Sequence, residues 1–471
     1  MTLHSTRQRT RLWLAAVSVI ALVSCSPQAS EPVPDVAAVT TPAHDPSWPA
    51  TAAADPSALG LDPQGLAALD AAMAASVANQ DVAGMVTLLA RKGEVAQFKA
   101  YGIQAGETPM TEHSLFRIYS MSKPITGVAL MQLYEQGKWT LDDPVTLHAP
   151  ELAGLKVMTG VDSKGQAILA NPSRPPTMRE IMAHTAGFGY GLSGNDPVNT
   201  AFRDQAVLGS ANLDEMMTKI AGIPLLFEPG QRWSYSVSVD IQGYLVQKLS
   251  GQKFGDYLKE HVFTPLGMND TAFFVAEENR GRFSDVYSWD KEAGKLAANP
   301  ERPDRPSFFD ANRLESGGGG LVSSTHDYAR FCQMMLNRGE LGGNRILKAE
   351  TVDLMTQNHI GDLRLYSDGT NANPGLPGVG FGLDYAVYTD PAAANAPYGQ
   401  GAYYWGGAAG TWFWIDPKNE LFFIGMIQRM GASRPDSMNF RDESARLVYA
   451  ALTPAAAPSS AAGAGGGEAG Q

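Results

Sequence analysis

Apolar and polar residues follow regular periods near both ends of the chain. Asp62 followed by Pro63 predicts a helix start, because aspartate caps a helix and proline is tolerated in its first turn. Two apolar runs come next, 85–90 and 94–98, and their junction at Lys92-Gly93 predicts a β-hairpin. The apolar face of the predicted helix consists of Leu66, Leu69, Met73 and Val77.

The C-terminal part of the chain predicts more strands. The predicted strands there are 378–388, 402–405, 411–415 and 421–427, followed by a final helix over 440–451. A turn at Asp416-Pro417-Lys418-Asn419 joins the last two strands. The pattern predicts an α+β fold in which one antiparallel sheet is assembled from both chain ends and flanked by helices.

The middle of the chain is loop-rich and contains helical pieces, such as the one that stops at Gly251. A helix is predicted from about Ser120 to Glu135 before this stretch. Another, capped by Ser324, is predicted after it. Cys332 lies on the apolar stripe of that later helix, so we expect a core cysteine rather than a nucleophile.

These patterns predict the domain organisation. Residues 26–55 and 453–471 are rich in small residues and proline and have little to bury. The expected parts are a lipoprotein signal peptide over 1–24, a disordered tether over 25–55, an α/β domain from 56–142 and 311–452, an inserted mostly helical domain over 143–310, and a disordered tail over 453–471.

The N-terminus has the features of an export signal. Three arginines precede the apolar run Leu12–Val23, which is too short to span a bilayer. The run ends in Leu22-Val-Ser-Cys25, which resembles the bacterial lipobox and implies cleavage before Cys25 and lipid attachment to its sulfur. Ser26, in place of aspartate, implies the outer membrane, facing the periplasm. The alternative is an ordinary signal peptide cut nearby.

The composition excludes several classes of protein. With 44% hydrophobic and 18% charged residues, the chain can build a large core. Acidic residues outnumber basic ones 48 to 36, and the net charge of −12 argues against nucleic acid as a partner. Two cysteines exclude a disulfide scaffold. The eight histidines show no His-x-x-x-His zinc pattern, so we expect no metal and no cofactor.

A Ser-x-x-Lys motif is the strongest sign of catalytic chemistry in the sequence. The chain has no Gly-x-Ser-x-Gly elbow, which disfavours an α/β-hydrolase. Ser-x-x-Lys occurs three times, but only Ser120–Lys123 stands between an apolar lead-in and a strong helix. One helical turn puts both side chains on one face, and burial there would disfavour the ammonium. Taken alone, the pair could equally be a helix cap and a solvated lysine.

Further segments change that balance. Phe116–Lys123 resembles the nucleophile segment of class C β-lactamases and their relatives, which include penicillin-binding proteins, D-peptidases and family VIII carboxylesterases. The run Ser316–Gly320 lacks the ending of a phosphate-binding loop and is interpreted as a tight turn. The segments that resemble this superfamily, in its order, are 181–187, 228–237, 316–324 and 405–410.

The resemblance implies roles for individual residues. Ser120 would attack an ester or amide carbonyl, and Lys123 and Tyr235 would share the general-base role. Which of the two holds the proton stays open. The backbone N–H groups of Ser120 and Ala408 would form the oxyanion hole.

Departures from the family pattern predict the substrate. Val237 replaces the asparagine of the Tyr-x-Asn motif, and Trp405-Gly406-Gly407 replaces Lys-Thr-Gly. These four residues are the expected substrate-binding positions. They lack the cation and polar groups that hold an anionic β-lactam, and they resemble family VIII carboxylesterases.

The predicted function is a serine carboxylesterase that cleaves small neutral esters through an acyl-enzyme on Ser120. One alternative is a β-lactamase or D-amino-acid peptidase of the cell envelope. The other is a non-catalytic surface lipoprotein on the same fold. The only membrane contact expected is the lipid on Cys25.

Overall fold

The computed structural model describes residues 48–49, 55–299, 306–366 and 375–453. All described residues belong to one compact unit. The predicted signal peptide, Cys25 and the predicted C-terminal tail lie outside the described residues, apart from the first residue of the tail. Within the predicted tether, Trp48 is described, and its Nε1–H donates to Gly93 O at 3.0 Å. The domain boundaries stay a prediction.

The helices begin and end close to the predicted positions. Asp62 caps α1 through the N–H groups of Gln64 and Gly65, and Gly251 ends α7 in the left-handed conformation, at φ +76°. None of the helices in the described ranges is long and apolar enough to cross a membrane. The helices are α1 (Pro63–Ala78), α2 (Ser122–Glu135), α3 (Val145–His148), α4 (Met178–Met182), α5 (Pro197–Asp204), α6 (Leu213–Ala221), α7 (Ser238–Ser250), α8 (Phe254–Leu258), α9 (Thr264–Leu266), α10 (Thr325–Leu336), α11 (Ala349–Met355) and α12 (Phe440–Ala450).

The strands belong to one large sheet and four two-stranded pairs. The large sheet contains β1 (Gly84–Arg91), β2 (Glu94–Ala105), β3 (Thr108–Pro109), β12 (Val379–Phe381), β13 (Ala386–Tyr388), β14 (Tyr403–Gly406), β15 (Trp412–Asp416) and β16 (Leu421–Ile427). The pairs are β4 (Leu115–Arg117) with β9 (Val322–Ser324), β5 (Val157–Val161) with β6 (Ala167–Ala170), β7 (Tyr287–Asp290) with β8 (Lys295–Ala298), and β10 (Glu340–Leu341) with β11 (Asn344–Arg345).

The large sheet joins the two ends of the chain, which confirms the predicted fold class. Its order is β12-β13-β14-β15-β16-β1-β2-β3. The central contact is antiparallel and runs from Met85↔Ile427 to Arg91↔Leu421. The single strand predicted over 378–388 is wrong: the chain turns back there, Gly382 N–H donates to Tyr385 O at 2.7 Å, and two strands form instead.

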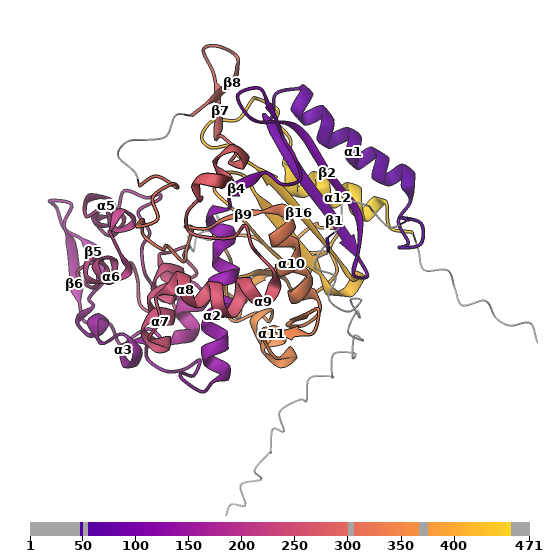
Figure 1. Ribbon diagram of the computed structural model, residues 1–471. Helices are drawn as coiled ribbons and strands as arrows, with labels where there is room; N and C mark the ends of the chain where they lie inside the picture. The colour runs from indigo at the N-terminus through magenta and orange to yellow at the C-terminus, as the bar shows by residue number, and fades with distance from the viewer. Residues whose placement is uncertain (1–47, 50–54, 300–305, 367–374, 454–471) are drawn as a thin grey trace, which may run out of the picture. The chain divides into compact units, whose positions relative to one another are not determined.

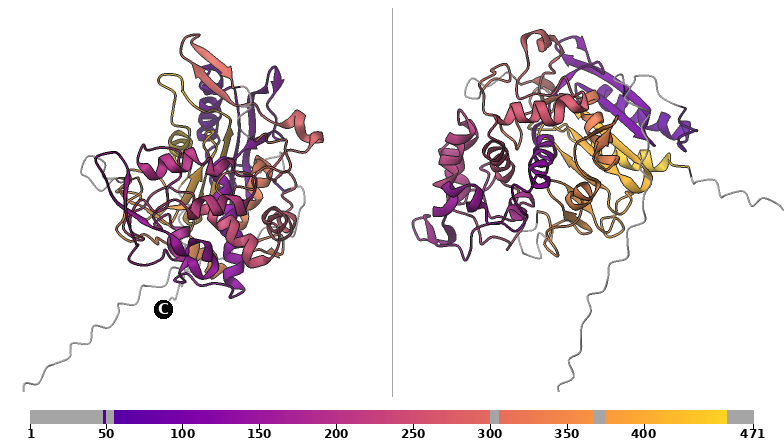
Figure 2. Two further views of the ribbon diagram at one scale, coloured as in Figure 1. Left: turned by 90° about the vertical axis from the view of Figure 1, so that its left-hand side faces the viewer. Right: turned by 60° about the horizontal axis from the view of Figure 1, so that its bottom comes forward.

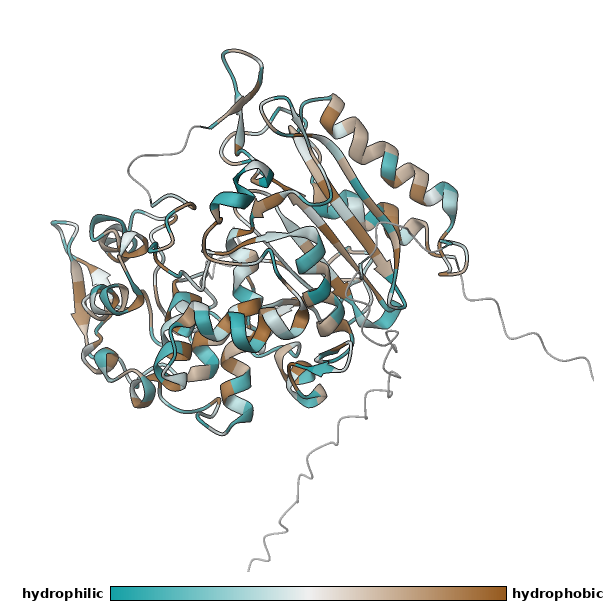
Figure 3. Ribbon diagram, viewed as in Figure 1, coloured by the Kyte–Doolittle hydropathy of each residue, from teal (hydrophilic) through white to brown (hydrophobic). Residues whose placement is uncertain are grey.

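Helices cover both faces of this sheet (Figure 1). Side chains alternate along β15: Trp412 stacks on Phe440 of α12 at 5.8 Å between ring centroids, and Phe413 contacts Tyr328 of α10 at 5.2 Å. Because successive strand residues point to opposite faces, α12 and α10 lie on opposite sides. The strands between them are largely hydrophobic (Figure 3), as expected for a sheet buried on both faces. Cys332 is fully buried under this sheet, as predicted.

The smaller helices gather beside α2, on the side away from the sheet (Figures 1 and 2). Helix α2 packs closely on α7, and α7 in turn packs on α4, α6 and α8. Helix α2 is therefore buried between the sheet and the helical pieces, and eleven of its fourteen residues are buried. Its N-terminus lies where the two parts meet, and this is where Ser120 is found.

Candidate active site

A short strand and a strained turn place Ser120. Strand β4 pairs with β9, and the N–H of Ile118 donates to Leu321 O at 3.1 Å. The chain then bends at Tyr119, whose φ of +41° is left-handed, a conformation that costs a non-glycine residue about 1–2 kcal/mol. Ser120 therefore lies in a 3-10 turn, and α2 starts only at Ser122. The helix start predicted at Ser120 is two residues too early.

Two donors converge on the Ser120 hydroxyl. Lys123 Nζ lies 3.2 Å from Ser120 Oγ. Tyr235 Oη donates to the same oxygen at 2.6 Å. Tyr235 precedes α7, 115 residues further along the chain, so only folding brings the three groups together. A hydroxyl between a potential base and a second proton donor is the arrangement that nucleophilic catalysis requires.

Lys123 is a buried lysine with an acceptor for each of its protons. Its side chain is 1% exposed. Besides Ser120 Oγ, Nζ donates to Tyr190 Oη at 3.1 Å and to Gly318 O at 2.6 Å. Burial lowers the pKa of Lys123 to about 8, although two buried carboxyl groups favour the ammonium. Near neutral pH a usable fraction of Lys123 is the free amine, which accepts a proton.

The pKa of Tyr235 is shifted in the opposite direction to that of Lys123. Burial raises the pKa of Tyr235 above its ordinary value, while hydrogen bonds with Ser120 and Trp405 act against this. Tyr235 therefore keeps its proton at pH values where Lys123 has lost one. The sequence left the base open, and this order favours Lys123 as the acceptor of the Ser120 proton and Tyr235 as a donor.

An aromatic cluster fixes the Tyr235 ring. Ring centroids lie 5.5 Å away for Trp405, 6.3 Å for Trp233 and 5.1 Å for His184. Burial lowers the pKa of His184 well below its ordinary value, and the charge of Lys123 adds to the effect, so His184 is neutral. Its Nδ1 lies 2.9 Å from Ser236 Oγ. His184 thus packs behind Tyr235 without adding charge.

The glycine run Ser316–Gly320 forms the predicted tight turn, closed by the Gly320 N–H on Ser316 O at 2.8 Å. At Gly318 it approaches Asp240 and Tyr190 so closely that a side chain would not fit. A Cβ on Gly318 would lie 2.4 Å from Asp240 Oδ2. The turn presents a main-chain carbonyl to Lys123, not amides to a phosphate.

A second glycine turn lies on the other side of Ser120. It follows β14, which packs beside the 3-10 turn that holds Ser120. A Cβ on Gly407 would come within 2.4 Å of Ile118 O, so this turn touches the main chain two residues before the nucleophile. The Gly407 N–H donates to Thr411 O at 2.7 Å. Ala408 is exposed, and among the described residues its N–H has no acceptor.

Comparisons with known proteins identify the family of this chain. The family model described as Beta-lactamase matches residues 69–446. The chain belongs to the beta-lactamase family. Among its relatives, esterase EstB of Burkholderia gladioli is 32% identical over 420 residues, which are 85% of this chain and 99% of EstB. Protein Rv1367c of Mycobacterium tuberculosis is 35% identical over 357 residues, 74% of this chain and 86% of that protein.

A solved structure of the family is also similar. EstCE1, "a hydrolase with promiscuous acyltransferase activity", has a TM-score of 0.67 and 26% identity, and covers 82% of this chain and 99% of its own. Family membership together with these relatives makes this protein a serine hydrolase.

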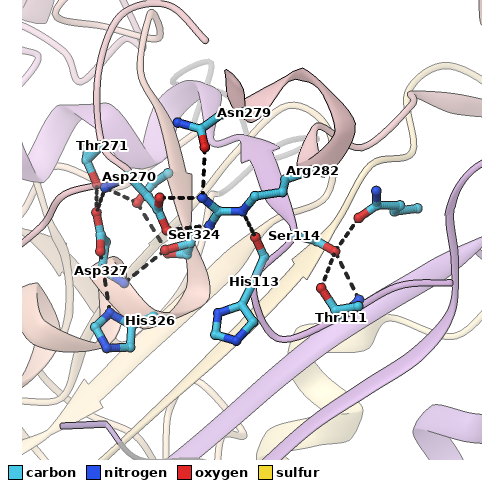
Figure 4. A network of polar contacts seen from close by, with 12 residues as sticks. Thr111, His113, Ser114, Asp270, Thr271, Asn279, Arg282, Ser324, His326 and Asp327 are labelled. Carbon is cyan, nitrogen blue, oxygen red and sulfur yellow. Dashed lines mark hydrogen bonds and ion pairs between the residues drawn. The ribbon is translucent and has the colours of Figure 1, made fainter. Parts of the chain in front are cut away.

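In this member of the beta-lactamase family, a polar network secures the strand pair that carries Ser120 (Figure 4). Arg282 binds both carboxylate oxygens of Asp270, at 2.8 and 2.7 Å, and donates to His113 O at 2.8 Å. The N–H of Asp270 donates to Asp327, in the first turn of α10, at 2.7 Å. Because β4 follows His113 and β9 precedes α10, the network ties both strands to one loop.

The remaining predicted residues are less central. Val237 is fully buried at the start of α7, and Trp405 is 6% exposed against Tyr235 and Phe381. Gly406 and Gly407 are half-buried at the end of β14. Their roles toward substrate stay predictions. Within the described residues, no group of three or more potential metal ligands occurs.

Several groups around Lys123 were not predicted. They are Tyr190, His184, Asp240, Asp384 and the Gly318 carbonyl. For the two aspartates a signal existed: each is a lone charge in an apolar run, between Val239 and Ile241 and between Leu383 and Tyr385. Tyr190, among glycines and aromatic residues, has no such signal.

Proposed function

We propose that this protein is a carboxylesterase that cleaves small neutral esters through an acyl-enzyme on Ser120. The observation that carries the proposal is the chain of contacts from Tyr235 Oη through Ser120 Oγ to Lys123 Nζ, with a lysine that loses its proton near pH 8. The similarity to esterase EstB supports the ester as substrate class, and the similarity to EstCE1, a hydrolase with promiscuous acyltransferase activity, supports acyl transfer.

The acylation step balances within this group of residues. Neutral Lys123 takes the proton of Ser120 as Oγ attacks the ester carbonyl carbon. The N–H groups of Ser120 and Ala408 would stabilise the resulting oxyanion, each by about 3–4 kcal/mol. When the C–O bond breaks, the leaving alkoxide takes a proton through the Tyr235 hydroxyl, which Lys123 resupplies. Lys123 ends neutral, and the acyl group is on Oγ.

Deacylation repeats the sequence with water. Lys123 takes a proton from water, directly or through Tyr235, as the water oxygen attacks the acyl carbon. Oγ leaves and recovers a proton, so the acid is released and the enzyme is restored. A small alcohol in place of this water would give a new ester by the same steps.

The surroundings of Ser120 favour a neutral substrate. Trp405 stands where Lys-Thr-Gly enzymes carry a lysine, and its indole packs against Tyr235. An apolar surface at this position does not compensate the desolvation of a carboxylate, whereas it gains from contact with an alkyl or aryl ester.

The test is a pair of substrates and one variant. Residues 26–471 and Ser120→Ala are compared on a short p-nitrophenyl ester and a chromogenic cephalosporin. We expect ester turnover that disappears in Ser120→Ala and little lactam opening. Faster lactam opening would favour the β-lactamase alternative. Ester turnover that survives in Ser120→Ala would rule out the mechanism.

We also propose that the mature protein is anchored in the cell envelope by lipid on Cys25, at the outer membrane facing the periplasm. The lipobox-like sequence before Cys25 supports this. Fractionation of cells that produce the full chain, beside Cys25→Ala, tests it. We expect the protein in the membrane fraction, with loss of the lipid mass and release from the membrane in Cys25→Ala. Equal membrane retention of both would contradict the anchor.

A further inference from the structure

Asp240 lies behind the active site, on α7, and takes no part in the steps described above. Its side chain is fully buried. Oδ1 accepts hydrogen bonds from the Ser316 hydroxyl and from the Gly318 N–H, the latter at 3.1 Å. Both donors belong to the glycine turn, so one carboxylate oxygen fixes the turn at two points.

The same turn contacts the base. Gly318, whose N–H is held by Asp240, presents its carbonyl oxygen to Lys123 Nζ at 2.6 Å, the shortest of the three Lys123 contacts. Asp240 Oδ2 is buried and has no hydrogen-bond partner within the described residues. A Cβ on Gly318 would lie 2.4 Å from this oxygen and 2.8 Å from Tyr190 Oη. The carboxylate, the turn and the tyrosine therefore surround one end of the lysine.

The titratable groups around Lys123 come from four places in the chain. Asp240 faces it from α7, Asp384 from the β12–β13 turn, and His184 and Tyr190 from the loop after α4. Tyr235 faces it across Ser120, with its ring 4.5 Å from Nζ. His184 is neutral, and burial raises the pKa of both tyrosines above their ordinary values.

The two carboxyl groups differ in their partners. Within the described residues the carboxyl group of Asp384 accepts one hydrogen bond, from Gln242 Nε2 at 3.0 Å, and burial raises its pKa well above the ordinary value. Burial also raises the pKa of Asp240, but Lys123, the Ser316 hydroxyl and the Gly318 N–H all favour its charged form. Asp240 is thus the better candidate for the negative charge that faces Lys123.

We propose that Asp240 is a positioning residue for the proposed esterase: it holds the glycine turn so that the Gly318 carbonyl receives Lys123, and it supplies the negative charge that faces this lysine. This proposal rests on the proposed function only in calling the enzyme an esterase. Its structural content concerns how Lys123 is placed and titrated.

The first experiment titrates Lys123 directly. The purified protein, labelled with ¹³C-lysine, is followed by NMR as a function of pH, and Lys123→Arg assigns the signal. Asp240→Asn removes the charge with little change of shape, and Asp384→Asn is the matched control. We expect the Lys123 midpoint to fall by about one pH unit in Asp240→Asn and by much less in Asp384→Asn. An unchanged midpoint in Asp240→Asn, or an equal fall in both variants, would overturn the charge assignment.

A second experiment separates position from charge. Ser316→Ala removes one bond to Asp240 and keeps the carboxylate. We expect the rate at which a fluorophosphonate labels Ser120 to fall roughly fivefold, as for one lost hydrogen bond, with the Lys123 midpoint close to that of the wild type. Labelling at the wild-type rate would overturn the positioning role. If Asp240→Asn does not fold, this Ser316→Ala experiment tests the proposal by itself. Absence of ester turnover would defeat the proposed function but leave both NMR comparisons valid.

Discussion

The groups on the two sides of Ser120 differ in their chemistry. On the side of Lys123, the contacts are a main-chain carbonyl, a tyrosine hydroxyl and buried charge. On the other side, the rings of Trp405 and Trp233 pack around Tyr235. Polar contacts have narrow distance and angle requirements, whereas ring packing tolerates substitutions of similar volume. The first side should therefore control the rate of proton transfer, and the second the choice of substrate.

The largest effect is expected from the polar side itself. Lys123→Ala removes the proton acceptor and should reduce kcat/KM for a p-nitrophenyl ester by about 10³-fold. Lys123→Arg should not restore activity, because a guanidinium keeps its proton. The exposed Lys164→Ala is the control and should have wild-type activity. Restoration by arginine would show that the charge, not proton transfer, is what Lys123 supplies.

Tyr235 belongs to both sides, and one substitution separates them. Tyr235→Phe keeps the ring packing and loses the hydroxyl that donates to Ser120. We expect kcat to fall by about 10²-fold with KM little changed. Tyr101→Phe, which removes a hydroxyl bound to Asp70 far from the site, serves as the control. A change confined to KM would place Tyr235 with the substrate-choosing side only.

The glycine turn offers a matched pair of neighbours. A Cβ on Gly318 would collide with Asp240 and Tyr190, whereas one on Gly319 would find its nearest atom at 3.7 Å. Gly318→Ala should reduce kcat/KM by about 10-fold or more, and Gly319→Ala by much less. Steady-state kinetics on both variants, with thermal melts to verify folding, test this. Equal losses would mean that the close approach of Gly318 to Asp240 and Tyr190 is not critical.

The pH profile tests the base assignment. The pKa of Lys123 is lowered to about 8, so the amine is protonated below that pH and free above it. We expect kcat/KM to rise about tenfold per pH unit below pH 8 and to level off above it. The measurement is initial rates over this range, corrected for ester hydrolysis in buffer. A profile that rises only near the ordinary lysine pKa would contradict a buried, free amine.

The smallest effect on rate is expected on the aromatic side. Trp405→Phe keeps an aromatic ring and loses area and the indole N–H. We expect KM for an aryl ester to rise a few-fold with kcat nearly constant. Short alkyl esters should be affected less than aryl esters. A large fall in kcat with all esters would show that Trp405 acts on the chemistry through Tyr235.

Local sequence was sufficient for most of the predicted elements and for the pair Ser120–Lys123. Asp62-Pro63, Gly251 and Ser324 each set a helix end through backbone hydrogen bonding and conformation, which depend on a few neighbouring residues. Ser120 lies in the 3-10 turn and Lys123 in the first turn of α2, three residues later, so their proximity needs only local backbone structure. The antiparallel sheet from both chain ends followed from strand periodicity and the order of elements.

Tertiary structure decided what lies around that pair and how it titrates. Tyr190, Tyr235, Asp240 and the Gly318 carbonyl reach Lys123 from 67 to 195 residues away. The strained turn at Tyr119 is set by the pairing of β4 with β9. The proton affinity of a lysine depends on its burial and on charges a few ångströms distant. Those distances exist only in the folded chain, so the sequence named two candidate bases and only the fold shifts their pKa values in opposite directions.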